Sequence, residues 1–308
     1  MRSRGLAGFF LLTGVLFTLR VLLGLIEFPQ AVAPVVDVLS VVAFVGLPVL
    51  AVFRAGSHPW TKPTAALFIV GGVVLQAGGL LLSRSPVGGG VVGLVVQSIG
   101  QFGLVAWCTG LGALVASLIK EKNLLLPVAL FLAGLDVFFV FHPSGPVAKV
   151  VAERPEILSS VALEVPMARE AVPGAAPQTP RIEPFAYVGP ADVFFSAMFF
   201  VALFRFEMRA RETARWLVAA LVAYLIVVML PIGMGMLPAL VPIGLTVVLV
   251  NLLEFQLSAQ EKAMTAFVGV IAFALAGYGI WSRITRPPAP PAVPSQPGSG
   301  QLPPGLEG

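Results

Sequence analysis

Two aspartates lie inside long apolar stretches of the chain, Asp136 in LAGLDVFFVF at 132–141 and Asp192 in YVGPADVFFS at 187–196. Both are followed by Val-Phe-Phe, and neither has a Lys or Arg within one helical turn. An ionisable side chain at bilayer depth is costly, so by default it marks a functional site. We therefore take these two carboxyl groups as the candidates for chemistry.

Two carboxyl groups that meet in a low dielectric can do acid–base chemistry together. They cannot both ionise, so they share one proton and titrate as a pair. The ionised member can act as general base on a water molecule while the protonated member acts as the acid. Aspartic proteases use this arrangement. The alternative is two unrelated polar residues that line a pore or a helix contact, and the residues alone leave both interpretations open.

The other ionisable residues have simpler explanations. Asp37 lies in the first two turns of an apolar stretch, where it either reaches the membrane interface or pairs with Arg20. Glu254 lies near the end of another apolar stretch, and we expect it at the interface. The only histidines, His58 and His142, lie at loop edges. We therefore expect no metal site, and the carboxylate chemistry needs no cofactor.

Membrane-spanning helices must position these candidates. Of 308 residues, 57% are hydrophobic and 11% are charged, whereas soluble domains are about 25% charged. The apolar residues form blocks long enough to cross a bilayer, which takes about 20 residues. The 19 Lys and Arg residues lie mostly between these blocks, as loop anchors and not as a nucleic-acid patch. We predict an all-α, polytopic transmembrane bundle with about nine spans.

The nine predicted spans are 5–26, 31–53, 63–82, 91–119, 124–141, 185–204, 216–232, 237–257 and 263–281. The fourth is long for one crossing, so it is either tilted or broken near Gly100 or Gly110. Residues 142–184 are rich in Pro, Ala and Glu, which predicts a flexible loop with little structure.

The chain is expected to be organised in four parts. They are N-terminal transmembrane helices over 1–122, candidate catalytic helices over 123–257, a C-terminal transmembrane helix over 258–285 and a disordered Pro-rich tail over 286–308. Basic residues concentrate in alternate loops, which places the N-terminus inside. The two aspartate-bearing spans are consecutive, so we expect them to pack antiparallel with both carboxyl groups at similar depth in the outer half of the membrane.

A third segment, Leu237-Pro238-Ala239-Leu240-Val241-Pro242, opens the eighth span. With the two aspartate segments it resembles the presenilin and signal peptide peptidase family of intramembrane aspartyl proteases. In that family one aspartate follows a tyrosine, the second ends a Gly-x-Gly-Asp motif on the next helix, and a Pro-Ala-Leu motif lies two helices later. The resemblance implies that Asp136 and Asp192 are catalytic. It also implies a substrate-binding set of Gly189, Pro190, Ala191, Pro238, Ala239 and Leu240.

Three residues depart from the family pattern. Leu135 stands where the family has the tyrosine, Ala191 stands where it has the second glycine, and Val241 is inserted before Pro242. The predicted span count also differs, with five spans up to the first aspartate's where the family has six. Ala191 adds a methyl group beside the second aspartate, and Leu135 removes a hydroxyl beside the first. Both departures bear on the rate of cleavage and on the choice of substrate.

The resemblance implies an aspartic endopeptidase that cleaves transmembrane segments of membrane proteins. Its partners are then substrate helices and the lipid bilayer, with no nucleic acid. Two alternatives use the same residues: a proton-coupled transporter in which the carboxyl groups carry protons, and a catalytically silent relative that binds helices. We expect a multi-pass integral protein of a prokaryotic cell membrane.

Overall fold

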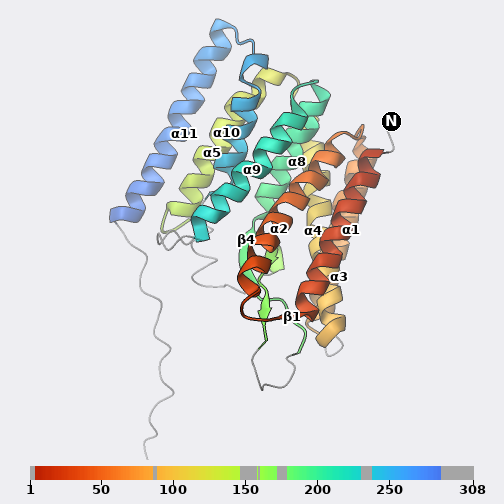
Figure 1. Cartoon of the computed structure of the whole chain (residues 1–308). Coiled ribbons are helices and arrows are strands. Elements are labelled where there is room, and N and C mark those ends of the chain that lie inside the picture. The colour runs from red at the N-terminus through yellow and green to blue at the C-terminus, as the bar shows by residue number, and fades with distance from the viewer. Residues whose placement is uncertain are drawn as a thin grey trace, which may run out of the picture.

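The computed structural model describes residues 4–85, 89–145, 158, 160–171, 179–229 and 238–285. Within these residues, nine α-helices run up and down beside one another, and short strands lie at one end of the bundle (Figure 1). The helices are α1 (Arg4–Leu25), α2 (Ala33–Gly56), α3 (Lys62–Ser83), α4 (Gly90–Ala116), α5 (Leu125–Phe141), α8 (Pro190–Arg205), α9 (Ala210–Met229), α10 (Leu240–Val250) and α11 (Ala259–Thr285). The predicted helical bundle is confirmed, and the strands are an addition to it.

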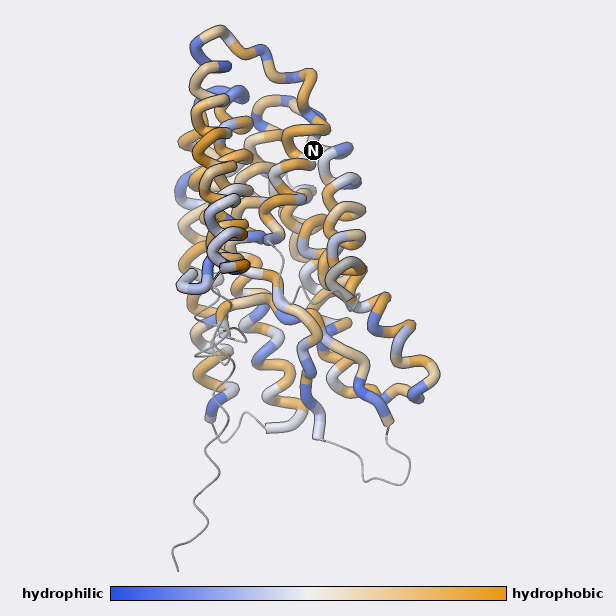
Figure 2. Tube along the Cα trace, turned by 90° about the vertical axis from the view of Figure 1, so that its left-hand side faces the viewer, coloured by the Kyte–Doolittle hydropathy of each residue, from blue (hydrophilic) through white to orange (hydrophobic). Residues whose placement is uncertain are grey.

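Six helices, α1 to α5 and α11, are long and apolar enough to cross a membrane, counting the short 3₁₀ turn Lys122–Leu124 with α5. The 16 residues of α8 and the 11 of α10 span only about 24 and about 17 Å at about 1.5 Å per residue. The hydrocarbon core of a bilayer is about 30 Å thick. The described part of the chain therefore supports a multi-pass membrane protein, with six long spans where the sequence predicted nine. Figure 2 shows hydrophobic residues along most of the helical length and hydrophilic residues mainly near the turns.

Several predicted boundaries were wrong for identifiable reasons. The sixth predicted span, 185–204, begins with strand β4 (Pro184–Val188), and α8 starts only at Pro190, because proline disfavours helical conformation in the residue before it. The eighth, 237–257, contains only α10 and a 3₁₀ turn, Leu252–Glu254. Of the two alternatives for the fourth span, tilted or broken, the break is excluded, since α4 is continuous over 27 residues.

The segment predicted as an unstructured loop contributes two strands to the described structure. Strand β2 (Leu163–Pro166) pairs antiparallel with β4, and β1 (Glu27–Phe28) pairs parallel with β3 (Arg169–Glu170). All four residues of β2 are buried. The prediction of little structure was therefore wrong for residues 160–171. Much of 142–184, the tail at 286–308 and the predicted ends at 232 and 237 lie outside the described residues.

Small residues let neighbouring helices approach closely. A Cβ added at Gly72 of α3 would lie 2.5 Å from the backbone nitrogen of Trp107 on α4, and one at Gly112 of α4 would lie 2.6 Å from the Cβ of Ala197 on α8. Close backbone approach of this kind is how membrane helices associate without a hydrophobic driving force between them. It fixes α3, α4 and α8 as one packed layer.

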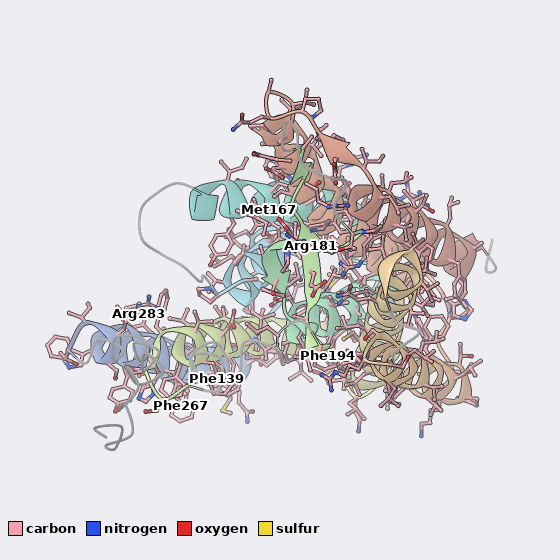
Figure 3. The ribbon with its side chains drawn as sticks, turned by 90° about the horizontal axis from the view of Figure 1, so that it is seen from below. Phe139, Met167, Arg181, Phe194, Phe267 and Arg283 are labelled. Atoms are coloured by element: carbon pink, nitrogen blue, oxygen red, sulfur yellow. The ribbon has the colours of Figure 1, made fainter. Side chains whose placement is uncertain are left out.

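The helices form two groups that meet at α9 and α10. Helix α8 packs mainly against α4 and α2, whereas α5 packs mainly against α10 and α11. Seen from below, α5 and α11 extend as an arm to one side, with Phe139, Phe267 and Arg283 along it (Figure 3). Helix α10 contacts α5, α9 and α8. The sequence led us to expect antiparallel packing of the two aspartate-bearing helices, and in the described structure α10 lies between them and contacts both.

Candidate functional site

Asp136 lies on α5 and is half-buried. Its Oδ2 atom accepts a hydrogen bond of 2.8 Å from the backbone N–H of Leu240. Leu240 is the first residue of α10, so this N–H is one of those that a helix leaves without an intrahelical partner. A carboxylate at a helix N-terminus is also favoured by the helix dipole. Asp136 therefore joins α5 to the first turn of α10.

Asp192 lies in the first turn of α8, where the chain leaves β4. Its Oδ2 atom accepts a hydrogen bond of 3.0 Å from the backbone N–H of Gly189, the residue that caps the helix. The Cys108 thiol of α4 lies 3.4 Å from the carbonyl oxygen of Pro190. The neighbourhood of Asp192 is thus set by the start of α8 and by α4, and its side chain is half-buried.

The two carboxyl groups belong to one site. They interact electrostatically with each other, and the hydroxyl of Tyr224 on α9 interacts with both of them. That hydroxyl donates a hydrogen bond of 2.8 Å to the carbonyl oxygen of Pro238. We call the group formed by Asp136, Asp192, Tyr224, Pro238 and Leu240 the aspartate site. It brings together four helices, α5, α8, α9 and α10.

Neither aspartate is paired with a cation among the described residues. The ion pairs there join Arg20 to Glu164, Arg169 to Glu27, Arg181 to Glu183 and Arg209 to Glu254. Two carboxylates without a nearby cation repel each other, which favours one shared proton over two negative charges. Both carboxyl groups lack a neutralising cation among the described residues.

The remaining predicted site residues also lie around the aspartates. Gly189 and Pro190 form the entry to α8, and Ala191 follows them with an exposed side chain. Pro238 is buried and Ala239 is half-buried immediately before α10. All of the residues that the sequence singled out thus lie at the starts of α8 and α10 or on α5, and their roles in binding and catalysis stay predictions.

Tyr224 is the site residue that the sequence reasoning missed. Leu135, at the position where the family that the sequence resembles has its tyrosine, carries no hydroxyl, whereas Tyr224 supplies one from α9. The available signal was a single phenol inside the apolar stretch LVAALVAYLIVVM at 217–229. A buried phenol usually finds a hydrogen-bond partner, and here that partner is the backbone just before α10.

The secondary candidates lie outside the aspartate site. Asp37 does not pair with Arg20; its Oδ1 atom accepts a hydrogen bond of 2.7 Å from the backbone N–H of Ala168, and Arg20 pairs with Glu164 instead. Glu254 lies in a partly exposed ion pair with Arg209, 3.2 Å apart. It belongs to the turn between α10 and α11, and this turn lies at the opposite end of the bundle from the strands (Figure 1). The described residues contain no group of three His, Cys, Asp or Glu side chains placed to hold one metal ion.

Fold and site together define a helical membrane protein with a half-buried pair of carboxyl groups. Comparison with protein-family models, with curated proteins and with solved structures gives no match. The family resemblance therefore depends on the three sequence segments, and the geometry of the aspartate site is independent of it.

Proposed function

We propose that this protein is an intramembrane aspartyl protease that cleaves transmembrane segments of membrane proteins. The observation that carries the proposal is the electrostatic interaction of Asp136 on α5 with Asp192 on α8, in a site that also includes Tyr224 on α9. Asp136 in addition binds the N–H of Leu240 at the start of α10, and carboxyl groups in unrelated contacts would have no reason to lie close enough to interact. The resemblance to presenilins and signal peptide peptidases points to the same residues.

The proposed reaction is hydrolysis of a peptide bond by an activated water molecule. The ionised aspartate removes a proton from water as the water oxygen bonds to the substrate carbonyl carbon. The protonated aspartate donates a hydrogen bond to the carbonyl oxygen, and a proton passes to the leaving nitrogen as the C–N bond breaks. No cofactor takes part. Leu240 orients Asp136 through its N–H, and Gly189 does the same for Asp192.

The backbone around the aspartates suits an extended substrate. Gly189, Pro190, Pro238 and Ala239 interrupt helical structure beside both carboxyl groups, and irregular backbone at membrane depth is tolerated where it is buried in protein or lines a cavity. A helical substrate must unwind locally before a peptide bond becomes accessible to water. With the N-terminus of the chain inside, the direction of α5 and α8 suits single-span substrates whose N-termini are also inside.

The experiment is cleavage by the full chain reconstituted in lipid vesicles with a panel of single-span peptides. Hydrolysis in ¹⁸O-labelled water adds one ¹⁸O atom to the new C-terminal carboxyl group, which mass spectrometry detects. Asp136→Asn and Asp192→Asn should each remove this product. Asp37→Asn is the matched control, because it makes the same chemical change at an aspartate outside the site.

The transporter alternative makes a different prediction in the same vesicles. An internal pH dye reports proton movement into the vesicles. Proton movement that is lost in both site variants, without any cleaved product, would identify the protein as a proton-coupled transporter and not a protease. Binding of peptides with neither cleavage nor proton movement would identify a silent helix-binding relative.

A further inference from the structure

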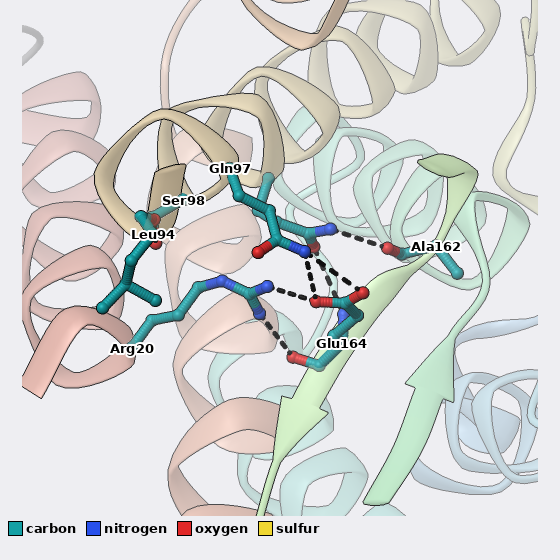
Figure 4. Close-up of polar contacts among 7 residues, drawn as sticks. Arg20, Leu94, Gln97, Ser98, Ala162 and Glu164 are labelled. Carbon is teal, nitrogen blue, oxygen red and sulfur yellow. Dashed lines mark hydrogen bonds and ion pairs between the residues drawn. The ribbon is translucent and has the colours of Figure 1, made fainter. Parts of the chain in front are cut away.

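A second polar group lies inside the bundle, away from the aspartate site. Arg20 of α1 and Glu164 of β2 form an ion pair, and each residue is only 2% exposed. Gln97 of α4 donates a hydrogen bond of 3.2 Å to the same carboxylate, and Gln101 donates one of 3.0 Å to the carbonyl oxygen of Ala162. We call Arg20, Gln97, Gln101 and Glu164 the Arg20–Glu164 cluster (Figure 4).

The cluster satisfies the backbone of β2 on the side away from β4. The backbone N–H of Glu164 donates to Gln101 Oε1 at 3.2 Å, and its carbonyl oxygen accepts from Arg20 Nη1 at 3.2 Å. An open strand edge inside an apolar bundle would leave such groups unpaired, which is strongly unfavourable. Side chains of α1 and α4 therefore take the place of a third strand. Strand β2 is held between these helices and β4.

Contacts to the N-terminal helices continue along the whole described segment 160–171. Gln76 of α3 donates a hydrogen bond of 2.9 Å to the carbonyl oxygen of Ser160, and the Ala168 N–H binds Asp37 of α2. Arg169 donates to the carbonyl oxygen of Gly24 at 2.7 Å and to the carboxylate of Glu27 at 3.1 Å. Segment 160–171 thus connects α1, α2, α3 and α4.

Strand β4 transmits this attachment to the aspartate site. Leu163 and Val165 of β2 lie opposite Val188 and Ala186 of β4. Val188 is followed directly by Gly189, whose N–H binds Asp192. The buried ion pair is therefore connected to Asp192 by one strand pair, β2 with β4, and one helix cap, Gly189.

We propose that the Arg20–Glu164 cluster is a positioning element for Asp192, which holds β2, and through it β4 and Gly189, at a fixed place relative to α4. In this way the cluster adds to the direct contact of α4 with the start of α8, and the N-terminal helices set the position of one of the two carboxyl groups. The effect on catalysis depends on the proposed function, whereas the effect on the position of residues 184–192 does not.

The first test measures position without any reference to cleavage. Hydrogen–deuterium exchange of the full chain in lipid nanodiscs reports the opening of residues 184–192 in the original protein and in Glu164→Gln, which keeps the size and removes the charge. We expect exchange in this segment to rise at least tenfold while exchange in α3 and α11 stays unchanged. Glu254→Gln is the matched control, because it removes the carboxylate of a partly exposed ion pair at the other end of the bundle.

A second variant covers the case in which Glu164→Gln fails to fold. Gln101→Met removes the contacts to the Glu164 N–H and to the Ala162 carbonyl group without leaving a charge unpaired. It should produce the same local rise in exchange. Unchanged exchange at 184–192 in this variant overturns the proposal, and so does a uniform rise over all helices.

The second test separates positioning from simple loss of structure. In the cleavage assay, Glu164→Gln and Gln101→Met should lower kcat at least tenfold with KM unchanged, and they should move the pH–rate profile, because the spacing of the carboxyl pair sets how it titrates. Arg20→Lys, which keeps the charge but has fewer donors, should retain part of the cleavage rate that Glu164→Gln and Gln101→Met lose. A fall in the amount of active protein with an unchanged pH profile would contradict the proposal. Absence of cleavage by the original protein would contradict the proposed function. The hydrogen–deuterium exchange test would then decide the positioning proposal by itself.

Discussion

The two polar groups inside this bundle are built on opposite principles. In the Arg20–Glu164 cluster a cation meets a carboxylate, both are almost fully buried, and glutamines and backbone groups surround them. In the aspartate site two carboxyl groups meet without a cation among the described residues, and each accepts one backbone N–H. The first arrangement balances charge, as a structural element requires. The second leaves like charges unbalanced, which is costly for stability and is typical of groups that exchange protons.

The difference separates residues that hold the fold from the residues that we propose act on a substrate. Both aspartates and Arg20 are ionisable residues in apolar helices, where an ionisable side chain is costly. Only their partners separate them. Substitutions in the two groups should therefore have opposite consequences, and the following four tests run from the largest expected effect to the smallest.

Replacing either site aspartate by asparagine should abolish function and preserve the fold. Asp136→Asn and Asp192→Asn remove the shared proton and the general base, which should lower the cleavage rate by about 10²–10⁴-fold. Stability should stay the same or rise, because like-charge repulsion is removed. The ¹⁸O assay measures the expected loss of cleavage, and thermal unfolding curves measure the expected stability. A variant that unfolds would place the aspartates with the structural group.

Breaking the buried ion pair should have the converse effect. Arg20→Met leaves the Glu164 carboxylate buried without its cation and should destabilise the protein by about 3–5 kcal/mol. The double variant Arg20→Met/Glu164→Leu removes both charges and should recover most of that loss, since apolar replacements of buried pairs are often neutral or better. Unfolding free energies in mild detergent measure both. Equal loss in the single and double variants would show that the charges do not act as a pair.

Removing the Tyr224 hydroxyl should produce an intermediate effect inside the site. Tyr224→Phe deletes the hydrogen bond to the Pro238 carbonyl and should cost about 0.5–1.5 kcal/mol, since that is the net worth of a typical hydrogen bond. Because Pro238 precedes the turn that holds Asp136, we expect the activation free energy of cleavage to rise by roughly the same amount, which lowers kcat. Tyr278→Phe is the matched control, as Tyr278 lies exposed on α11. Equal rates for the two variants would remove Tyr224 from the aspartate site.

The smallest effect is expected at Asp37. Its side chain holds only the backbone N–H of Ala168, and Asp37→Asn keeps an oxygen acceptor in place. Exchange of a charged for a neutral acceptor should cost less than about 1.5 kcal/mol, without change in the cleavage rate. Hydrogen exchange at Ala168 gives the local measurement. A loss of activity comparable to that of Asp136→Asn would mean that this third aspartate belongs with the catalytic pair.

Several features of this protein were determined by local sequence. Apolar stretches of about 20 residues predict membrane helices, and the described part of the chain contains six helices of that kind. Pro190 is the first residue of α8, because proline is favoured at the first position of a helix. Aspartates within apolar stretches stand out at once, so the amino-acid sequence alone is enough to single out Asp136 and Asp192.

Tertiary structure decided the partners, because partners are chosen over long distances in the chain. Arg20 meets a carboxylate 144 residues away, and the sequence around Glu164 reads as a polar, Pro- and Ala-rich loop although β2 is fully buried. Tyr224 reaches the aspartates only because α9 packs against α10, and α10 bridges α5 and α8. Hydrophobicity along the chain reports which segments leave water. It carries no information on which polar groups those segments then bring together, since that depends on helix packing and on the need to satisfy every buried charge and backbone group.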